Sequence, residues 1–211
     1  QNGDIQSQSE LAGQRHSERL LAMIAQAMNK AGLKLSQLDG IAFGAGPGSF
    51  TGVRIACGVA QGLALGADLP VLGVCTLQAV AHAVGHNKVI AAIDARMNEV
   101  YFAAYQMQSS VNNLSKWTTV CEPVLSLPQS TPDIVGSGWI GAGSGFLAHS
   151  EALNARYGAQ LAGVDATIIP QASVMAQLAA PLFAAGQGQD AALALPLYLR
   201  DKVALKISER P

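Results

Sequence analysis

The chain has 211 residues, enough for one large or two small domains, and its 13 Lys and Arg against 14 Asp and Glu give a net charge of −1. Without a cluster of basic residues, direct salt-driven binding of nucleic acid by this chain alone is not expected. Charged residues make up 13% of the chain, well below the roughly 25% of an ordinary domain, so we expect small-residue, apolar surface that a partner subunit covers. Three cysteines without C-x-x-C spacing, with no signal peptide or spanning segment in the sequence, indicate a reducing, cytoplasmic location.

The N-terminal part predicts a hairpin fragment followed by a helix. The first residues, QNGDIQSQSE, look like the turn and second strand of a hairpin with Asn2-Gly3 as the turn, so we expect the native chain to begin before Gln1. An amphipathic helix is predicted from Gln14 to Ala31, because apolar residues recur there at helical spacing and Gly32 can serve as its C-cap.

A glycine-rich turn lies between a predicted strand at Ile41–Phe43 and a predicted helix from Val53 to about Leu65. Such turns can present backbone N–H groups to a phosphate, so an anion or nucleotide site is one hypothesis and a tight strand-to-helix turn is the other. We favour the tight turn, because the Walker, Rossmann and hydrolase-elbow patterns each fail at a required position. The residues whose backbone angles or hydroxyl caps would shape this turn are Gly46, Gly48, Ser49 and Thr51.

The predicted helix after this turn carries glycines at four-residue spacing, at Gly58, Gly62 and Gly66. Each interior glycine costs a helix roughly 1 kcal/mol relative to alanine, so a compensating close approach of another backbone is expected. Membrane pairing uses the same spacing, but Arg54 and Gln61 interrupt the apolar residues before a spanning length is reached. We therefore predict a helix contact outside the membrane, with a partner inside this chain or in another one.

A short strand at Val71–Val74 and a helix at Leu77–Val84, capped by Thr76, complete an alternating α/β pattern. The helix carries His82, and His86 follows four residues later, the spacing of two zinc ligands. Two surface histidines are the favoured interpretation, because Gly85 is expected to end the helix between them and no third ligand is evident.

The second half opens with two strands, Val89–Asp94 and Glu99–Tyr105, joined by a tight turn in which Asn98 suits a left-handed conformation. Asp94 and Arg96 lie where a strand leaves the sheet, a common place for functional groups. The alternative, which we favour, is a purely structural network of the Asp, Arg and Glu side chains of this turn.

Beyond the second strand the sequence is irregular from 106 to 138, with weak strands expected around Trp117–Leu125 and a flexible excursion. The remaining predicted elements are a strand at Trp139–Ala142, a glycine turn at 143–145, a helix at Phe146–Tyr157, a helix at Ala172–Ala185 that Pro181 should kink or split, and an extended segment at Pro196–Arg200.

Four segments, in this order, resemble the TsaB (YeaZ) family: GPGSFTGVR at 46–54, GVAQGLALG at 58–66, AIDARMNEVY at 92–101 and PLYLR at 196–200. The resemblance spans nearly the whole chain. It implies an α/β fold of the actin-like, sugar-kinase and Hsp70 (ASKHA) type with two related subdomains, here 1–86 and 87–211. It also implies that the first strand of the fold is missing here and that the last segment can return to the first subdomain.

The resemblance further implies a role in making threonylcarbamoyladenosine, the modified adenosine beside the anticodon of ANN-decoding tRNAs. In this family the chain is the non-catalytic partner of TsaD, the ATPase TsaE completes the assembly, and tRNA is met only through the complex. TsaD holds its metal with an H-x-x-x-H helix, whereas here His16 is followed four residues later by Leu20, so a catalytic metal site is not expected. No cofactor is expected, weak nucleotide binding is left open, and the chain is expected to form a homodimer when TsaD is absent.

No catalytic or metal-ligating residue is therefore predicted. The predicted partner interface consists of His16, Leu20, Leu21, Ile24, Met28, Arg54, Ile55, Gly58, Val59 and Gly62. A possible vestigial nucleotide or anion loop would consist of Gly46, Gly48, Ser49, Thr51, Asp94, Arg96, Gly143 and Gly145. Two alternatives are weighed against this role, an ATP-dependent small-molecule kinase of the same fold class and a glycoprotease-like metallopeptidase. The spacing of the candidate metal ligands supports neither of them.

Overall fold

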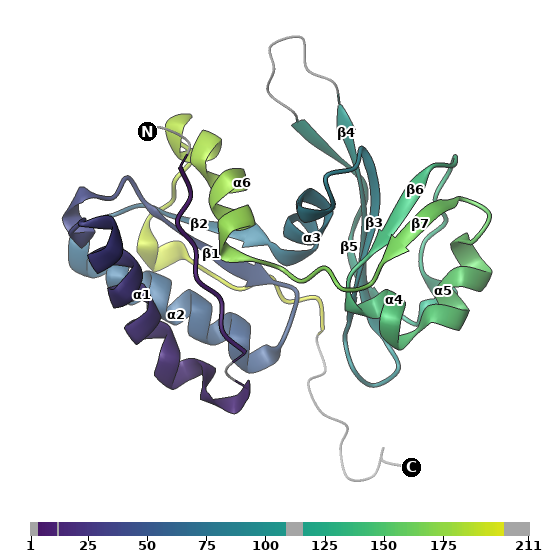
Figure 1. Cartoon of the computed structure of the whole chain (residues 1–211), viewed down its shortest axis with the longest axis horizontal. Helices are drawn as coiled ribbons and strands as arrows, with labels where there is room; N and C mark the ends of the chain where they lie inside the picture. Colours follow the sequence, from purple (N-terminus) through teal and green to yellow (C-terminus); the bar gives the residue numbers. More distant parts are fainter. Residues whose placement is uncertain (1–3, 12, 109–115, 201–211) are drawn as a thin grey trace.

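The computed structural model describes residues 4–11, 13–108 and 116–200, which form two α/β lobes (Figure 1). The helices are α1 (His16–Ala31), α2 (Phe50–Ala67), α3 (Thr76–Val84), α4 (Ser144–Ala148), α5 (Ser150–Tyr157) and α6 (Ala172–Ala184). The strands are β1 (Ile41–Gly46), β2 (Val71–Cys75), β3 (Lys88–Asp94), β4 (Val100–Gln108), β5 (Lys116–Ser126), β6 (Trp139–Ala142) and β7 (Leu161–Asp165).

The first lobe is built on the parallel pair β1 and β2, which lies between helices on both faces. One side of α2 packs its four buried residues, Val53, Cys57, Ala60 and Ala64, toward β1 and the segment near Ala194. On the opposite face, α6 contributes Met175 and Ala179 to a second cluster with β2. The small residues on this side of α2 let the helix lie close to the strands, and this packing explains why they are small.

The second lobe is a five-stranded sheet in the order β5-β4-β3-β6-β7. β4 is antiparallel to β3 and β5, whereas β6 runs parallel to β3 and β7. Its fully buried strand residues, such as Ile90 and Phe102, pack under α4 and α5 together with Tyr157. The other face is covered by α3, whose Leu77 and Val80 are completely buried, so α3 joins the two lobes.

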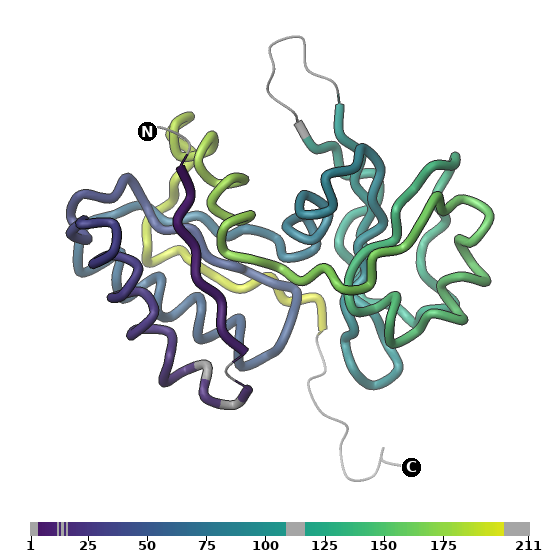
Figure 2. Tube along the Cα trace, in the orientation of Figure 1, coloured from purple at the N-terminus to yellow at the C-terminus, as the bar shows by residue number. Residues whose placement is uncertain are grey.

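The chain passes from the first lobe to the second through α3 and returns after β7, along the segment that leads into α6 (Figure 2). The final extended residues then lie against the first lobe again, because the Leu197 N–H donates to the Ala45 carbonyl at 2.7 Å. The two lobes are therefore built from interleaved parts of the chain.

Several predicted elements are confirmed. Gly32 and Gly85 adopt the left-handed C-cap conformation after α1 and α3, and Asn98 has a φ of 58° in the turn after β3. The Ser49 hydroxyl caps α2 by accepting a hydrogen bond from the Gly52 N–H at 3.3 Å. α2 itself is longer than predicted, since it begins at Phe50 and ends at Ala67.

The strands expected around Trp117–Leu125 are confirmed as β5, an 11-residue edge strand that accommodates Pro123 next to a register shift opposite Phe102 and Ala104. Other predicted elements are wrong. The predicted helix at 146–157 begins at Ser144 and is broken at His149 into α4 and α5, since His149 has non-helical backbone angles, with a φ of −131° and a ψ of 38°. Residues 109–115, in the predicted flexible excursion, and the predicted turn at Asn2-Gly3 lie outside the described residues, and residues 4–11 belong to no strand.

The predicted cap of α3 and the predicted break in α6 are both absent. Thr76 does not cap α3 with its side chain, because its hydroxyl donates instead to the Pro47 carbonyl and thereby ties α3 to the glycine turn. Pro181 does not split α6, since the helix continues to Ala184. Its missing N–H removes one helical hydrogen bond, and the helix still closes beyond it, because the Ala185 N–H donates to the Pro181 carbonyl at 3.1 Å.

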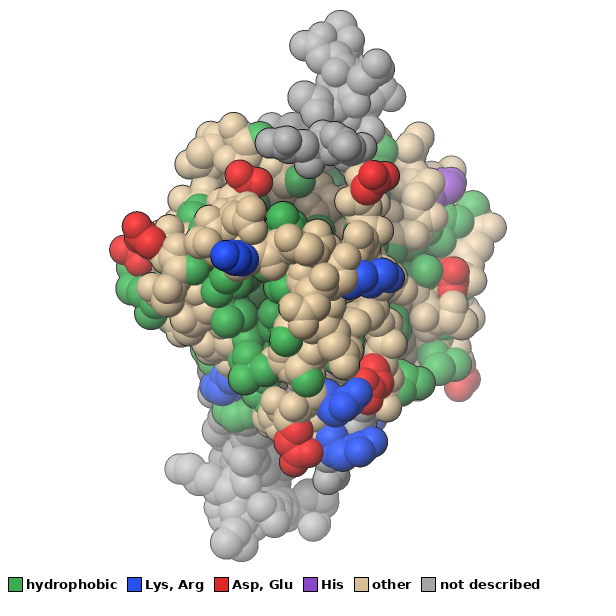
Figure 3. Space-filling view, turned by 60° about the vertical axis from the view of Figure 1, so that its left-hand side comes forward, with side chains coloured by type: hydrophobic (Ala, Val, Ile, Leu, Met, Phe, Trp, Pro, Cys, Tyr) green, Lys and Arg blue, Asp and Glu red, His purple; other side chains and the backbone are tan. Residues whose placement is uncertain are grey.

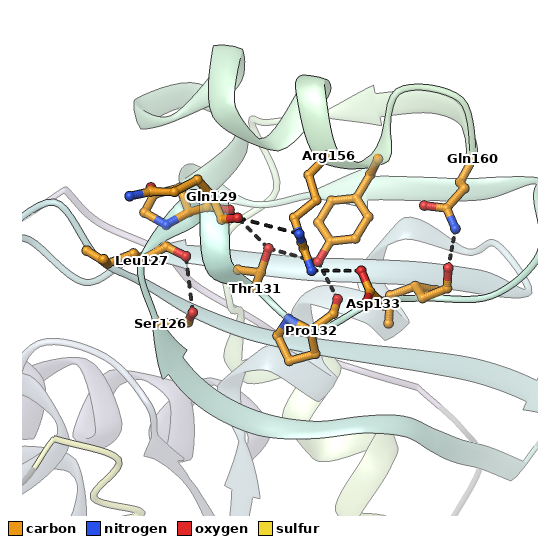
Figure 4. A network of polar contacts seen from close by, with 11 residues as sticks. Ser126, Leu127, Gln129, Thr131, Pro132, Asp133, Arg156 and Gln160 are labelled. Atoms are coloured by element: carbon orange, nitrogen blue, oxygen red, sulfur yellow. Dashed lines mark hydrogen bonds and ion pairs between the residues drawn. The ribbon is translucent and has the colours of Figure 1, made fainter.

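A polar network holds the loop after β5 against α5 (Figure 4). The Tyr157 hydroxyl lies 2.8 Å from Thr131 Oγ1 and 2.6 Å from the Pro132 carbonyl oxygen. The Arg156 guanidinium forms an ion pair with Asp133 at 2.8 Å and donates to the Gln129 carbonyl. Burial raises the pKa of Tyr157, as expected of a phenol used as a neutral core group. We interpret this network as structural.

The two histidines of the predicted pair have separate surroundings. His82 is half-buried rather than at the surface, and its Nδ1 accepts a hydrogen bond from Trp117 Nε1 at 2.9 Å. His86 is exposed, and its ring lies near the backbone of Lys88. Within the described ranges, no three His, Cys, Asp or Glu side chains are grouped so that they could hold a metal ion.

The half-buried imidazole of His82 gives an expected pH dependence of stability. Burial lowers the pKa of His82 below its usual value, against an opposing hydrogen bond from Gln177. The unfolded chain then binds the proton first, so the free energy of unfolding should decrease as the pH falls through about 6.5. Urea denaturation at several pH values checks this, and His82→Gln should remove part of the decrease. An unchanged pH dependence in that variant would contradict this account of His82.

Candidate partner interface

The outward side of α2 is an exposed surface of small and apolar residues. It is defined here as the α2 face, residues Arg54, Ile55, Gly58, Val59, Gly62, Leu65 and Gly66, which recur at helical spacing. Arg54 and the three glycines are exposed, Leu65 is 62% exposed, and the valine and isoleucine are half-buried. By length and composition α2 could cross a membrane, but its other side is packed on β1, so we describe it as a helix of the first lobe.

The glycines of the α2 face have no packing partner within the described residues. A Cβ atom added at Gly58, Gly62 or Gly66 would meet nothing within 4 Å outside the helix. The helical cost of these glycines is therefore not offset by a close approach inside the described chain. Of the two alternatives that the sequence left open, this geometry favours a partner in another chain.

α1 lies beside α2 (Figure 1), and the predicted residues of α1 divide between two environments. Leu20 and Ile24 line a groove of about 340 Å³ that also involves residues 5–9 and the start of α6. Leu21, in contrast, is 55% exposed, and Met28 is half-buried. His16 is the first residue of α1, and its side chain lies outside the described part of the structure.

Figure 3 turns the left-hand side of Figure 1 forward and shows how this side of the molecule is composed. Hydrophobic side chains are spread over much of it, and the charged side chains are few and mostly separate from one another. A surface of this kind loses little solvation energy when a partner covers it, because few charges must be stripped of water.

The residues of the predicted anion loop are only partly brought together. A cavity of about 480 Å³ between the two lobes is lined by Gly48, Ser49, Asp94 and Arg96 among others. Gly46 lies behind it, with a φ of 106° and the Leu197 carbonyl 3.2 Å from the position of an added Cβ. Thr51 is exposed in the first turn of α2.

The second glycine loop faces the sheet instead of this cavity. An added Cβ at Gly143 would lie 2.5 Å from the Ala92 carbonyl oxygen, and one at Gly145 would lie 2.8 Å from the Ala92 side chain. Gly143 also has a φ of 98°, a backbone angle that residues other than glycine rarely adopt. The packing of α4 on β3 therefore accounts for both glycines.

The carboxylate of Asp94 is already engaged by its neighbours. Its Oδ1 accepts the Arg96 N–H at 2.9 Å and lies 3.6 Å from His149 Nε2, and its Oδ2 pairs with the Arg96 guanidinium at 3.2 Å. The Arg96 side chain is 87% exposed, so this pair contributes little stability. Glu99, the third member of the predicted turn network, pairs instead with Arg200, which was not predicted as part of a site.

Comparison with known proteins decides the family. A family model described as TsaD, tRNA N6-adenosine threonylcarbamoyltransferase, matches residues 5–124. The tRNA threonylcarbamoyladenosine biosynthesis protein TsaB of Escherichia coli K12 is 37% identical over 210 residues, covering 97% of this chain and 89% of that protein. The chain belongs to the TsaB family. The TsaB protein of Haemophilus influenzae is 38% identical over 206 residues, which cover 94% of this chain and 85% of that one.

Two solved structures agree with the fold. YeaZ from Pseudomonas aeruginosa superimposes with a TM-score of 0.81 at 36% identity, covering 94% of this chain and 91% of that one. A second crystal structure, of an uncharacterized protein with similarity to peptidase YeaZ from Pseudomonas aeruginosa, gives a TM-score of 0.77 at 39% identity, covering 88% of this chain and 84% of that one. The predicted ASKHA-type α/β fold of the TsaB chain is confirmed by these neighbours together with the TsaD family model.

Proposed function

We propose that this TsaB-family chain is a non-catalytic subunit that docks through the α2 face and the exposed side of α1 on a TsaD-type threonylcarbamoyl transferase. In that complex it supports threonylcarbamoyladenosine modification of ANN-decoding tRNAs. The observation that carries the proposal is the open row of Gly58, Gly62 and Gly66, which costs helix stability and has no partner among the described residues. The names of the TsaB relatives supply the reaction, and the family model supplies the class of partner.

The glycine row suits a helix partner in particular. Without side chains at these three positions, a second helix can approach the α2 backbone closely, and the surrounding Ile55, Val59 and Leu65 provide apolar contact around it. The family model that matches this chain is described as TsaD, so a TsaD-type subunit is the proposed occupant. A second copy of this chain would occupy the same face when that subunit is absent.

The remaining parts of the proposal follow from the family. The chain works in the cytoplasm without a cofactor of its own, the ATPase TsaE joins the assembly, and tRNA contacts the complex through TsaD. The net charge of −1 supports an indirect contact with tRNA, because binding to phosphates requires clustered Lys and Arg.

Reconstituted tRNA modification tests the proposed role. Purified TsaD, TsaE, threonylcarbamoyl-adenylate source and tRNA should give modified adenosine only when this chain is added, and this chain with tRNA and the source alone should give none. Full activity of TsaD in its absence would contradict the proposal, as would modification by this chain alone.

A further inference from the structure

The last described residues, 194–200, form an extended segment that is called the C-terminal strap here. At its start, the Ala194 carbonyl lies 3.3 Å from Cys57 Sγ and 3.2 Å from Gln61 Nε2, both on α2. Further along, Leu197 is bonded to the end of β1. In Figure 1 the strap runs from the first lobe toward the space between the lobes. It therefore follows the inner side of α2 and then leaves it.

At its far end the strap reaches the turn that follows β3. Arg200 donates from one guanidinium nitrogen to the Ala95 carbonyl at 2.9 Å and to Glu99 Oε2 at 2.6 Å, while the other nitrogen lies 2.9 Å from Met97 Sδ. The Arg200 side chain is 15% exposed, although it is one of the most polar groups in the chain. A buried guanidinium held in this way fixes the position of its acceptors.

The turn held by Arg200 is one that needs support. Its three residues Arg96, Met97 and Asn98 all have positive φ, between 53° and 60°. Two backbone hydrogen bonds close it, from the Ala95 N–H to Glu99 and from the Glu99 N–H to Arg96. A run of left-handed residues is costly for side-chain-bearing amino acids, so the surrounding contacts must maintain it.

The strap also touches the exposed end of α2. The Arg54 guanidinium lies 3.3 Å from the centroid of the Phe50 ring and 4.6 Å from that of Tyr198 on the strap. Arg54 belongs to the α2 face, and Phe50, Tyr198 and Arg200 all line the cavity between the lobes. One continuous set of contacts therefore connects the partner-binding helix to the turn of the second lobe.

We propose that Arg200 is a positioning residue that couples the α2 face to the turn at 95–99. Through the strap it holds the two lobes in one arrangement, so that a partner docked on α2 also meets the second lobe in a fixed place. The proposal rests on the proposed function, since it concerns what the docked chain does for the activity of the transferase. It predicts that loss of Arg200 lowers the activity of the complex more than its affinity.

Three variants of the full chain test this role: Arg200→Met, Arg200→Lys and Glu99→Gln. In Arg200→Met the amide exchange rates of Ala95 and Glu99 should rise about tenfold or more, while those of Ala103 and Ala104 in the sheet stay unchanged. Glu99→Gln keeps the size of the side chain and should show a smaller rise of the same kind, and Arg200→Lys should lie between the wild type and Arg200→Met. The exchange measurement needs no partner, so its outcome is independent of the proposed function.

The second measurement uses the reconstituted complex. With saturating Arg200→Met, the rate of tRNA modification should fall by about fivefold to tenfold, while the dissociation constant for TsaD changes by less than about twofold. The exchanged pair Glu99→Arg with Arg200→Glu should recover part of the lost rate. Wild-type exchange at 95 and 99 in both Arg200→Met and Glu99→Gln would overturn the proposal, and so would a lowered rate that is explained entirely by weaker TsaD binding. If Arg200→Met fails to fold, Glu99→Gln decides between these results.

Discussion

Replacing Gly58 and Gly62 together by leucine should abolish co-purification with a TsaD-type partner while the chain stays folded. A Cβ atom added at either position meets nothing within 4 Å in the described structure and both glycines are exposed, so the isolated chain should accommodate a side chain that points away from it. In a docked complex the same leucines would occupy the space of the partner backbone, and overpacking of a tight contact costs about 1–3 kcal/mol per site. The two substitutions should therefore weaken binding by about thirtyfold or more. Pull-down and calorimetric titration measure the loss, and circular dichroism confirms the fold.

The matched control is the double variant Gly58→Ala and Gly62→Ala. Alanine favours a helix over glycine by roughly 1 kcal/mol, so this variant should unfold at a higher urea concentration than the wild type. Its methyl groups should nevertheless reduce partner affinity, although less than leucine does. Higher stability together with lower affinity would separate the docking role from the folding role of these glycines. Undiminished pull-down by the leucine variant would contradict the docking role.

Replacing Gly143 by alanine should cost the chain about 3 kcal/mol of unfolding free energy. The new Cβ would lie 2.5 Å from the Ala92 carbonyl oxygen in the buried strand β3, and the φ of 98° is unfavourable for alanine. Such a loss is a large part of the 5–15 kcal/mol that holds a typical domain. Urea denaturation followed by tryptophan fluorescence measures it, because Trp139 is buried in the neighbouring strand β6.

Gly136→Ala is the control for the backbone part of this effect. Gly136 has a φ of 88°, but the nearest atom to an added Cβ is Lys88 Nζ at 3.7 Å. Gly136→Ala should therefore lower the free energy of unfolding by only about 1 kcal/mol, the cost of the left-handed conformation. Equal losses in the two variants would show that contact with Ala92 does not set the cost at Gly143. Normal stability of Gly143→Ala with a specific loss of nucleotide binding would instead revive the anion-loop hypothesis.

Features governed by local sequence were predictable. The strand, turn and helix between Ile41 and Ala67 follow from glycine and hydroxyl positions within a few residues of each other, and Ser49 caps α2 as expected. The α2 face was likewise visible as glycines at four-residue spacing. That these glycines lack a packing partner among the described residues was not visible, because a sequence does not say which side of a helix the rest of the chain covers.

Features governed by distant residues were missed. β5 was expected only as weak strands around Trp117–Leu125, and what the sequence did not indicate is the register of its pairing with β4, which accommodates Pro123. The Gly143 loop looks like a ligand loop in the sequence, whereas its reason is Ala92, 51 residues earlier, in the strand beneath it. Arg200 forms its ion pair with a residue 101 positions away. The sequence pointed to Arg200 only as the last residue of the PLYLR segment and did not indicate its ion pair with Glu99.

The most direct test of the docking face is site-specific photo-crosslinking in the assembled complex. A benzoylphenylalanine at Leu65, on the α2 face, should form a cross-link with the TsaD-type subunit. The same group at Leu147 on α4, which is even more exposed at 73%, should form none. A cross-link from position 65 alone is the predicted result. Absence of a cross-link from position 65, with or without one from position 147, would contradict the assignment of α2 as the partner-binding helix.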